Sequence, residues 1–293
     1  DVQKHVKRCH ACQLYKRRHQ KYGKLPPKEA EAQPWEHLCV DLIGPYLIRR
    51  KGKPPLSLTA VTMIDPATGW FEIRETKTKT SDVIANHVEI AWLTRYPWPV
   101  YITYDHGGEF LGQEFQALVN EEYGIKARPA SKCNPQANAV LERIHATLGN
   151  MVKTFEVQDR EMDEEDPWIG ILSAVAWAIH STYHTTTQAT PGQLVFGRDM
   201  IWNLPYIADW RYIQQRKQNM INKNNERENS KRIEHDYAVG DKILKRIGNA
   251  YKLERSKEGP YEIIRVHTNG TVTIQDGAIT EHLNIHQIDP YKG

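Results

Sequence analysis

After residue 33, short apolar runs alternate with turn-forming residues. Runs of this length, closed by residues such as Asp, Pro and Gly, indicate strands. Three of them, residues 37–43, 58–64 and 70–74, predict an antiparallel meander. We expect the first strand to stop at Gly44-Pro45, because a glycine followed by a proline usually interrupts a strand. A fourth run, residues 100–104, predicts a strand with Asp105 at its carboxyl end.

Apolar residues spaced three and four positions apart mark the helices of the same region. Ser81 precedes the first of these helices and is expected to cap it. Further helices are predicted before and after a short strand at 125–129, and they cover residues 112–122, 136–155 and 168–183. Strands and helices mixed in this way favour an α/β fold.

The last third of the chain has a different pattern. Residues 211–236 are polar and predict a solvated helix that links two domains. From Tyr237 onward, short strands alternate with turn residues, which is typical of a small β-barrel. Turns are expected at Gly259-Pro260, Asn269-Gly270 and Asp276-Gly277.

The composition excludes several classes of protein. A chain of 293 residues with 40% hydrophobic and 26% charged residues can bury a core, and it is not disordered throughout. No apolar run approaches the roughly 20 residues of a membrane-spanning helix, and no signal-peptide pattern stands at the start. Four cysteines are too few for a disulfide scaffold, so we expect a reducing compartment.

The net charge of +3 hides a separation of charge along the chain. Residues 1–33 carry nine Lys and Arg against three acids, and residues 211–257 carry thirteen against six. The residues between these basic flanks are acidic overall. This pattern suits a protein that binds a polyanion while its core carboxylates attract cations. Solvated charged faces would give the same counts, so charge alone leaves both interpretations open.

Three carboxylates differ from the solvated ones in their setting. Asp41 lies inside an apolar strand, Asp105 ends a neighbouring strand, and Glu142 lies on the predicted helix 136–155. Acids placed in this way can converge on one point, and such a cluster of oxygen ligands binds Mg²⁺. Two ions about 3.5–4 Å apart would support an in-line phosphoryl displacement. Each acid alone is better explained as a surface charge, but their joint setting favours a metal site.

The basic N-terminal segment contains a close pair of cysteines, Cys9 and Cys12. Two intervening residues allow both thiolates to bind one tetrahedral zinc ion. No second pair of ligands follows at the usual spacing. The pair is therefore half of a zinc site, and two ordinary reduced cysteines are the alternative.

Ordered blocks of the sequence resemble the integrases of retroviruses and retrotransposons, nearest those of Ty3/gypsy long-terminal-repeat elements. Three blocks carry the acids, and they are residues 37–45, 103–110 and 134–143. Residues 184–198 resemble the block that follows the catalytic core in these elements, and Gly259-Pro260-Tyr261 resembles their Gly-Pro-Tyr/Phe module. Cys9 and Cys12 match the last two ligands of the family's His-His-Cys-Cys zinc module. The resemblance covers nearly the whole chain.

The resemblance implies an α/β fold whose RNase H-like catalytic core has a mixed five-stranded sheet with helices. A partial zinc-binding module would precede this core, and a small all-β SH3-like barrel would follow it. The implied domains are residues 1–33 (zinc-module end and basic linker), 34–200 (core), 201–236 (helical linker) and 237–293 (barrel). The chain would then begin inside the zinc module and be a fragment of a longer polyprotein.

The resemblance also implies an activity. Asp41, Asp105 and Glu142 would be the D,D,E triad that holds two Mg²⁺ or Mn²⁺ ions. The enzyme would trim the 3′ ends of the element's DNA and then join these ends to target DNA. Asp105 and Glu142 have 36 residues between them where the family usually has 35, and we place the extra residue before Gly124, where it should not displace the triad.

Further residues of the same region are implied to contact DNA. Asn138 lies one helical turn before Glu142, where the family contacts the donor end, and Arg143 and His145 project near the metals. The lysines that many relatives carry after the glutamate are Ala146 and Gly149 here. Lys132, Arg143 and Lys153 would replace their contacts.

The implied partners are the element's DNA ends and target DNA, held by a homo-oligomer (dimer or tetramer) that acts in the nucleus. Zn²⁺ would bind through Cys9 and Cys12 in the intact N-terminal module. One alternative is a domesticated, catalytically idle DNA-binding or assembly protein. A second is an RNase H-type nuclease that cleaves RNA–DNA hybrids.

Overall fold

The computed structural model describes residues 2–16, 20–30, 33–50, 53–129, 145–150, 168–248, 254–277 and 279–292. The chain forms two compact units. One consists of residues Ala30–Gln218, and the other combines Asp1–Glu29 with Asn219–Gly293. Each unit has its own sheet and its own hydrophobic core.

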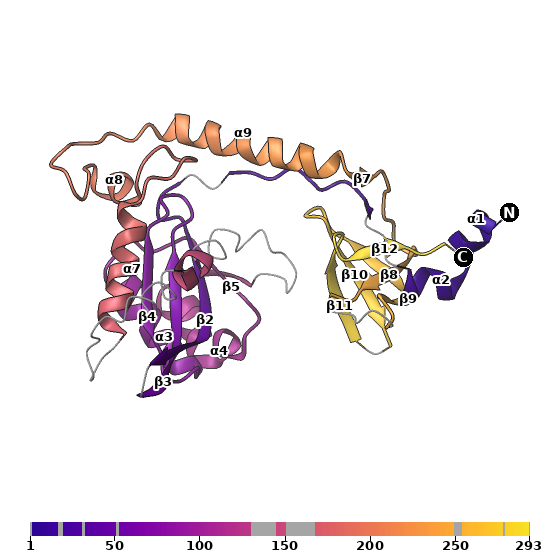
Figure 1. Ribbon diagram of the computed structural model, residues 1–293, viewed down its shortest axis with the longest axis horizontal. Helices are drawn as coiled ribbons and strands as arrows, with labels where there is room; N and C mark the ends of the chain where they lie inside the picture. The colour runs from indigo at the N-terminus through magenta and orange to yellow at the C-terminus, as the bar shows by residue number, and fades with distance from the viewer. Residues whose placement is uncertain are drawn as a thin grey trace. The chain divides into compact units, whose positions relative to one another are not determined.

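A mixed five-stranded sheet in the order β4-β3-β2-β5-β6 forms the centre of the Ala30–Gln218 unit (Figure 1). The strands are β2 (His37–Arg50), β3 (Lys53–Ile64), β4 (Phe71–Glu75), β5 (Tyr101–Tyr104) and β6 (Lys126–Pro129). β2, β3 and β4 form the predicted antiparallel meander, and β5 and β6 run parallel to β2. The mixed five-stranded sheet that the sequence predicted is confirmed.

β2 does not stop at Gly44-Pro45, and that prediction was wrong. The strand continues to Arg50, and its register with β3 shifts between Ile43 and Tyr46. Gly44 has φ +99°, and a Cβ atom there would lie 2.2 Å from the carbonyl oxygen of Leu58. The dipeptide therefore forms a bulge within a continuous strand, which only a glycine allows at this position.

Short helices cover one face of this sheet. They are α3 (Ser81–Val88), the π-helical η1 (Glu89–Leu93), α4 (Gly108–Leu111), α5 (Gln113–Gln116) and the π-helical η2 (Ala117–Glu122). Their apolar side chains pack on alternate strand residues such as Leu38, Val40 and Ile102. The predicted N-cap was one residue late, because Thr80 is the cap of α3 and Ser81 is its first residue. The Ser81 hydroxyl instead accepts the N–H of Phe115 at 3.0 Å.

The opposite face carries α7 (Ile169–Ser181) and the helical residues 145–150. Phe71, Leu148 and Val175 belong to the core on this side. α7 is also held by His180, whose ring stacks on Trp70 and whose Nε2 donates to the carbonyl oxygen of Phe71 at 2.6 Å. Most of the predicted helix 136–155 lies outside the described residues.

Two further helices follow α7. α8 (Pro191–Phe196) begins with a capping box, in which Thr190 and Gln193 each bond the other's backbone N–H. α9 (Trp210–Asn229) forms the first part of the predicted polar helix 211–236, and Ile213 is the buried residue of its sequence. The helix ends earlier than predicted, because Arg232 and Ile233 form a short strand. Ala30 donates its N–H to Oε1 of Gln218 at 2.9 Å. The first and last residues of this unit are therefore hydrogen-bonded to each other.

The second unit contains a five-stranded antiparallel sheet in the order β11-β10-β9-β8-β12. Its strands are β8 (Lys242–Arg246), β9 (Lys257–Val266), β10 (Thr271–Asp276), β11 (Ile279–Asn284) and β12 (Ile288–Pro290). The turns predicted at Asn269-Gly270 and Asp276-Gly277 connect β9 to β10 and β10 to β11. The turn predicted at Gly259-Pro260 was wrong, because β9 runs through both residues.

The N-terminal residues belong to this same unit. α1 (Val2–Arg8) and α2 (His10–Tyr15) are followed by β1 (Lys21–Tyr22), which pairs in parallel with β7 (Arg232–Ile233). The buried side chain of Gln13 bonds both backbone groups of Lys292, at 2.8 Å to the carbonyl and 3.0 Å from the N–H. The two ends of the chain thus fold together around the β domain.

The buried guanidinium of Arg232 strengthens this union. It donates to the carbonyl oxygens of Gly23, Tyr22 (2.7 Å) and Ile285 (3.2 Å). This side chain thereby joins its own strand, β7, to residues 22–23 and to Ile285.

Among the helices that the structure describes, none combines the length and the apolar character required to span a membrane.

Candidate active site

Asp41 lies within β2, and Asp105 directly follows β5, which is the neighbouring strand of the sheet. β2 and β5 are parallel, and their register pairs Cys39 with Thr103. Each acid lies two residues further along its strand, so both side chains project from the same face. Adjacent strands are ~4.8 Å apart, so Asp41, within β2, and Asp105, directly after β5, are neighbours across the two strands.

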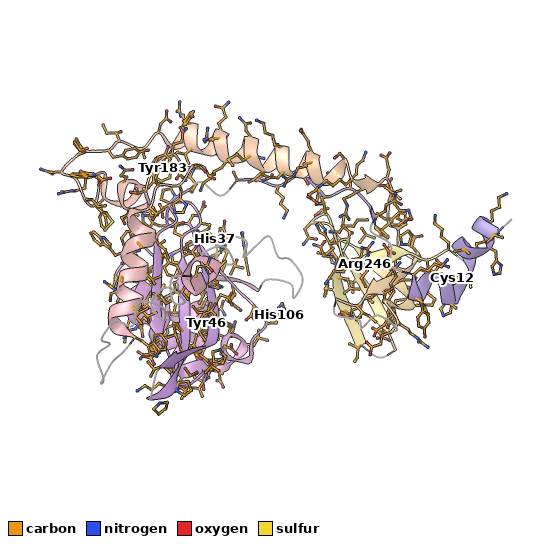
Figure 2. All side chains as sticks on the ribbon, in the orientation of Figure 1. Cys12, His37, Tyr46, His106, Tyr183 and Arg246 are labelled. Atoms are coloured by element: carbon orange, nitrogen blue, oxygen red, sulfur yellow. The ribbon has the colours of Figure 1, made fainter. Side chains whose placement is uncertain are left out.

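The two carboxylates differ in burial. Asp41 is half-buried, with 21% of its side chain exposed, and its Oδ1 accepts the N–H of Leu42 at 2.9 Å. Asp105 is exposed, and its Oδ1 accepts the N–H of Gly107 at 2.9 Å in the turn that contains His106 (Figure 2). This hydrogen bond orients Asp105 at the point where β5 ends and α4 begins.

His145 lies against Asp41 from the helical residues 145–150. Burial lowers the pKa of His145 to about 4, so its ring is neutral at pH 7. Its Nδ1 lies 3.8 Å from Oδ2 of Asp41. Because the ring is neutral and this distance exceeds that of a hydrogen bond, the contact is not an ion pair.

Thr62 determines which ring nitrogen of His145 carries the hydrogen. Its hydroxyl donates its single hydrogen to the carbonyl oxygen of Asp41 at 3.0 Å. The 2.9 Å contact between that hydroxyl and Nε2 of His145 must therefore have the ring nitrogen as donor. A neutral imidazole with its hydrogen on Nε2 presents a bare lone pair on Nδ1. Two acceptors, Nδ1 of His145 and Oδ2 of Asp41, consequently face each other.

This arrangement fits a divalent cation. Two acceptors that face each other repel unless a cation or a hydrogen-bond donor lies between them, and the carboxylates of Asp41 and Asp105 are the oxygen donors that Mg²⁺ prefers. The third predicted ligand, Glu142, lies outside the described residues. Within the residues that are described, no group of three or more His, Cys, Asp and Glu side chains could hold a metal ion.

Of the five residues predicted to contact DNA, His145 alone is among the residues that the structure describes. His145 lies next to Asp41. Asn138, Arg143, Lys132 and Lys153 lie outside the described residues. Their roles stay predictions.

Sequence reasoning missed Thr62 and Tyr46. Thr62 is the residue of β3 paired with Asp41, so the register of the predicted meander could have identified it. Burial, together with the charge of Asp41, raises the pKa of Tyr46, which is labelled in Figure 2. Tyr46 follows the Gly44-Pro45 bulge, so a prediction that ended the strand there could not place it.

Cys9 and Cys12 lie close together at the start of α2, both half-buried (Figure 2). Hydrogen bonds from the backbone and then the thiol of Cys12 lower the pKa of Cys9. The hydrogen bond between the two thiols raises the pKa of Cys12. The two thiols are thus close to each other, and the half zinc site stays a prediction.

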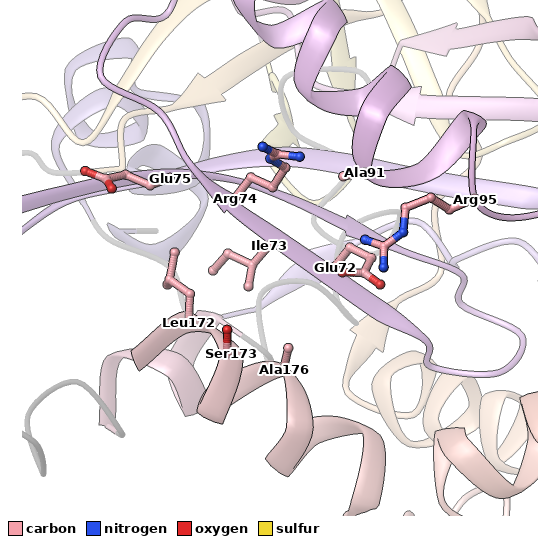
Figure 3. Close-up of a pocket in the computed structure, with 9 residues that line it drawn as sticks. All are labelled: Glu72, Ile73, Arg74, Glu75, Ala91, Arg95, Leu172, Ser173 and Ala176. Atoms are coloured by element: carbon pink, nitrogen blue, oxygen red, sulfur yellow. The ribbon is translucent and has the colours of Figure 1, made fainter. Parts of the chain in front are cut away.

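A hollow of about 470 Å³ lies at the opposite edge of the central sheet, between β4, η1 and α7 (Figure 3). Its charged lining combines Glu72 and Glu75 with Arg74 and Arg95. β3 and β2 separate β4 from β5, which carries Asp105 at its end. This hollow is therefore distinct from the site of the two aspartates.

No family model matches the chain. It is 27% identical over 187 residues to a Pro-Pol polyprotein of feline foamy virus, covering 61% of this chain and 14% of that protein. It is 25% identical over 270 residues to the retrovirus-related Pol polyprotein from transposon 412 of Drosophila melanogaster, covering 84% and 21%. The chain thus spans between a seventh and a fifth of the length of these curated relatives.

A solved structure shares the fold of nearly the whole chain. It is a chain of the simian T-cell lymphotropic virus intasome in complex with the PP2A regulatory subunit B56 gamma. The TM-score is 0.65 at 16% sequence identity, over 99% of this chain and 89% of that one. The chain is thus similar in sequence to Pol polyproteins of retroviruses and retrotransposons, and it shares the fold of this intasome chain.

Proposed function

We propose that this chain is the integrase of a retrotransposon, a metal-dependent polynucleotidyl transferase that inserts the element's DNA into target DNA. The observation that carries the proposal is the parallel register of β2 and β5, from which Asp41, within β2, and Asp105, directly after β5, are neighbours. The shared fold with an intasome chain supports it. Glu142, three positions before His145 in the sequence, would complete the triad.

Each residue of the site would have a separate role. Asp41 and Asp105, with Glu142, would hold two Mg²⁺ ions, which activate the attacking oxygen and stabilise the leaving one when bound. The hydrogen bonds from Leu42 and Gly107 fix the orientation of the two aspartates in advance. Thr62 keeps the bare Nδ1 of His145 turned toward Asp41.

Two reactions would share this site. In 3′-end processing, water attacks a phosphodiester near the end of the element's DNA and leaves a 3′-hydroxyl. In strand transfer, that hydroxyl attacks a phosphodiester of the target, and the target strand departs with its own 3′-hydroxyl. Both are in-line displacements at phosphorus, so one pair of metal ions serves both.

The proposed integrase would also bind DNA and further copies of itself outside this site. The basic residues of 1–33 and 211–257 would bind phosphates without reading sequence. A homo-oligomer would hold two DNA ends, and Zn²⁺ would bind Cys9 and Cys12 together with two ligands from the intact N-terminal module. The protein would be made as part of a polyprotein and act in the nucleus.

The test is a strand-transfer assay with labelled duplexes that carry terminal-repeat sequences, in Mg²⁺. We expect joined products from the wild-type chain and at least 10³-fold less from Asp41→Asn, Asp105→Asn and Glu142→Gln. Glu114→Gln, an exposed acid on α5, is the matched control and should join like wild type. Joining by any triad variant at the wild-type rate contradicts the proposal.

Two other outcomes identify the alternatives. A folded wild-type chain that binds DNA but joins no end sequence would be the idle DNA-binding protein. Cleavage of RNA–DNA hybrids in the absence of strand transfer would identify an RNase H-type nuclease. Either result replaces the proposed function.

A further inference from the structure

A stack of three side chains crosses the central sheet at its β2–β5–β6 side. The rings of His37 and Tyr101 lie 4.5 Å apart at an interplanar angle of 29°. The guanidinium of Arg128 lies 3.6 Å from the centre of the Tyr101 ring. Tyr101 thus stands between a ring on β2 and a cation on β6.

The stack is anchored at its inner end. His37 is buried, and its Nε2 lies 2.9 Å from the hydroxyl of Thr103 and 3.4 Å from the sulfur of Cys39 (Figure 2). His37, fixed in this way, supports Tyr101, and Tyr101 supports the guanidinium. Arg128 therefore needs little further ordering to hold a ligand.

The outer end of the stack is a cation available for binding. Arg128 is exposed, and so is Lys126 on the same strand. Within the described ranges, no carboxylate forms an ion pair with Arg128. A guanidinium that stacks through its flat face keeps its N–H groups pointing outward from its edge, in the geometry that matches a phosphate.

The position of Arg128 relates it to the two aspartates. Arg128 pairs with Thr103 across β5 and β6, and Asp105 lies two residues beyond Thr103 on the same face. Two residues along a strand and one strand spacing across place the Cα atoms of Arg128 and Asp105 about 8 Å apart. One strand of DNA advances ~3.4 Å per nucleotide, so this separation corresponds to about two nucleotides.

We propose that Arg128, held on Tyr101, binds a backbone phosphate of the DNA about two nucleotides from the phosphodiester at Asp41 and Asp105. The proposal rests on the proposed function for the identity of the ligand. Arg128 would hold the substrate strand in register with the aspartates, while His37 and Tyr101 act through it as positioning residues.

The experiment measures binding of the full chain to a hairpin duplex with a single open end, by fluorescence anisotropy at several KCl concentrations. We expect Arg128→Ala to weaken binding about 10-fold and to lower the slope of log K against log salt by about one. Arg128→Lys keeps the charge without the flat, two-pronged geometry and should fall between. Arg95→Ala is the matched control, because Arg95 is also exposed and lies 5.7 Å from the ring of Tyr96, near the separate hollow at β4.

A neutral methylphosphonate placed at each linkage near the open end then locates the contact. At one linkage the substitution should weaken wild-type binding about as much as Arg128→Ala does, and it should weaken the variant no further. Unchanged binding by folded Arg128→Ala, or full additivity at every linkage, overturns the proposal. Because these measurements need no joining, a wild-type chain that shows the coupling yet joins no ends would refute the proposed function alone.

Discussion

The ring of His145 turns a bare nitrogen toward the carboxylate of Asp41, at 3.8 Å between Nδ1 and Oδ2. Thr62 maintains this orientation by accepting the hydrogen on the other ring nitrogen. Facing acceptors are unfavourable without a cation or a donor between them, so the repulsion between them should favour metal binding. Thr62 would then support metal binding without contacting the metal.

We therefore expect Thr62→Val to weaken Mn²⁺ binding by about 10-fold or more, because loss of a residue that orients a metal site typically costs 10- to 100-fold in affinity. His145→Ala should weaken binding comparably. Free Mn²⁺ can be followed by electron paramagnetic resonance in the absence of DNA, which separates binding from catalysis. Thr59→Val, on the same strand but the opposite face, is the control. Wild-type Mn²⁺ affinity in both Thr62→Val and His145→Ala would show that the orientation does not matter.

The bulge at Gly44 leads to a second prediction. An alanine at this position would combine a positive φ with a Cβ 2.2 Å from the carbonyl of Leu58, so backbone atoms must shift. We expect Gly44→Ala to lower the free energy of unfolding by at least about 2 kcal/mol. All eight tryptophans lie in the Ala30–Gln218 unit, so tryptophan fluorescence in urea reports on this unit.

Gly170 on α7 is the matched control for Gly44. A Cβ there would meet nothing within 4 Å, and Gly170→Ala should change stability by less than about 1 kcal/mol. Equal stability of the two variants would mean that the strand relaxes around Gly44 without cost.

The sequence predicted the meander and the strand that ends before Asp105, because these follow from local alternation and turn residues. It did not predict that β2 continues through Gly44-Pro45 or that β9 continues through Gly259-Pro260. A glycine–proline pair locally favours a turn, but the pairing with neighbouring strands on both sides of it keeps the strand continuous. The contacts of Gln13 and Arg232 join residues more than 200 positions apart. No local pattern encodes such contacts. The role of Thr62 needed the register between two strands.

The hydrogen bonds of Gln13 allow a third prediction. Gln13→Ala would leave the N–H and the carbonyl of Lys292 without their partner, and we expect a loss of about 2 kcal/mol. Gln13→Glu should cost more at pH 7, because a carboxylate cannot donate to the Lys292 carbonyl and would be buried with its charge. Hydrogen exchange at residues 10–15 and 288–292 reads out the effect, with the exposed Gln214→Ala as control. Protection as in wild type in Gln13→Glu would contradict the role assigned to this side chain.

His286 makes the stability of the second unit depend on pH. Burial, assisted by the charge of Arg232, lowers the pKa of His286 to about 4, and its Nδ1 lies 3.2 Å from the Arg232 guanidinium. An unfolded histidine binds a proton below about pH 6.5. The unfolded state therefore gains protons first, and stability should fall as the pH drops from about 6.5 to 4.

The size of this effect should be on the order of 2 kcal/mol, reduced by the partial exposure of the ring. Hydrogen exchange of β10 and β12 between pH 7 and pH 4.5 measures it. His286→Gln should flatten the dependence, whereas His5→Gln, an exposed histidine on α1, should leave it unchanged. An identical pH dependence in His286→Gln and wild type would show that other groups are responsible.

The second unit is built from two separate stretches of the sequence, and β1 of the first stretch pairs with β7 of the second. The unit built from Asp1–Glu29 and Asn219–Gly293 is interrupted in sequence by the whole Ala30–Gln218 unit, and the hydrogen bond between Ala30 and Gln218 brings the two junctions together. The central unit is thus an insertion in the sequence of the second unit, and the two ends of this insertion lie next to each other. A short loop could replace it, or a homologous core could be exchanged for it, without cutting a strand of either sheet.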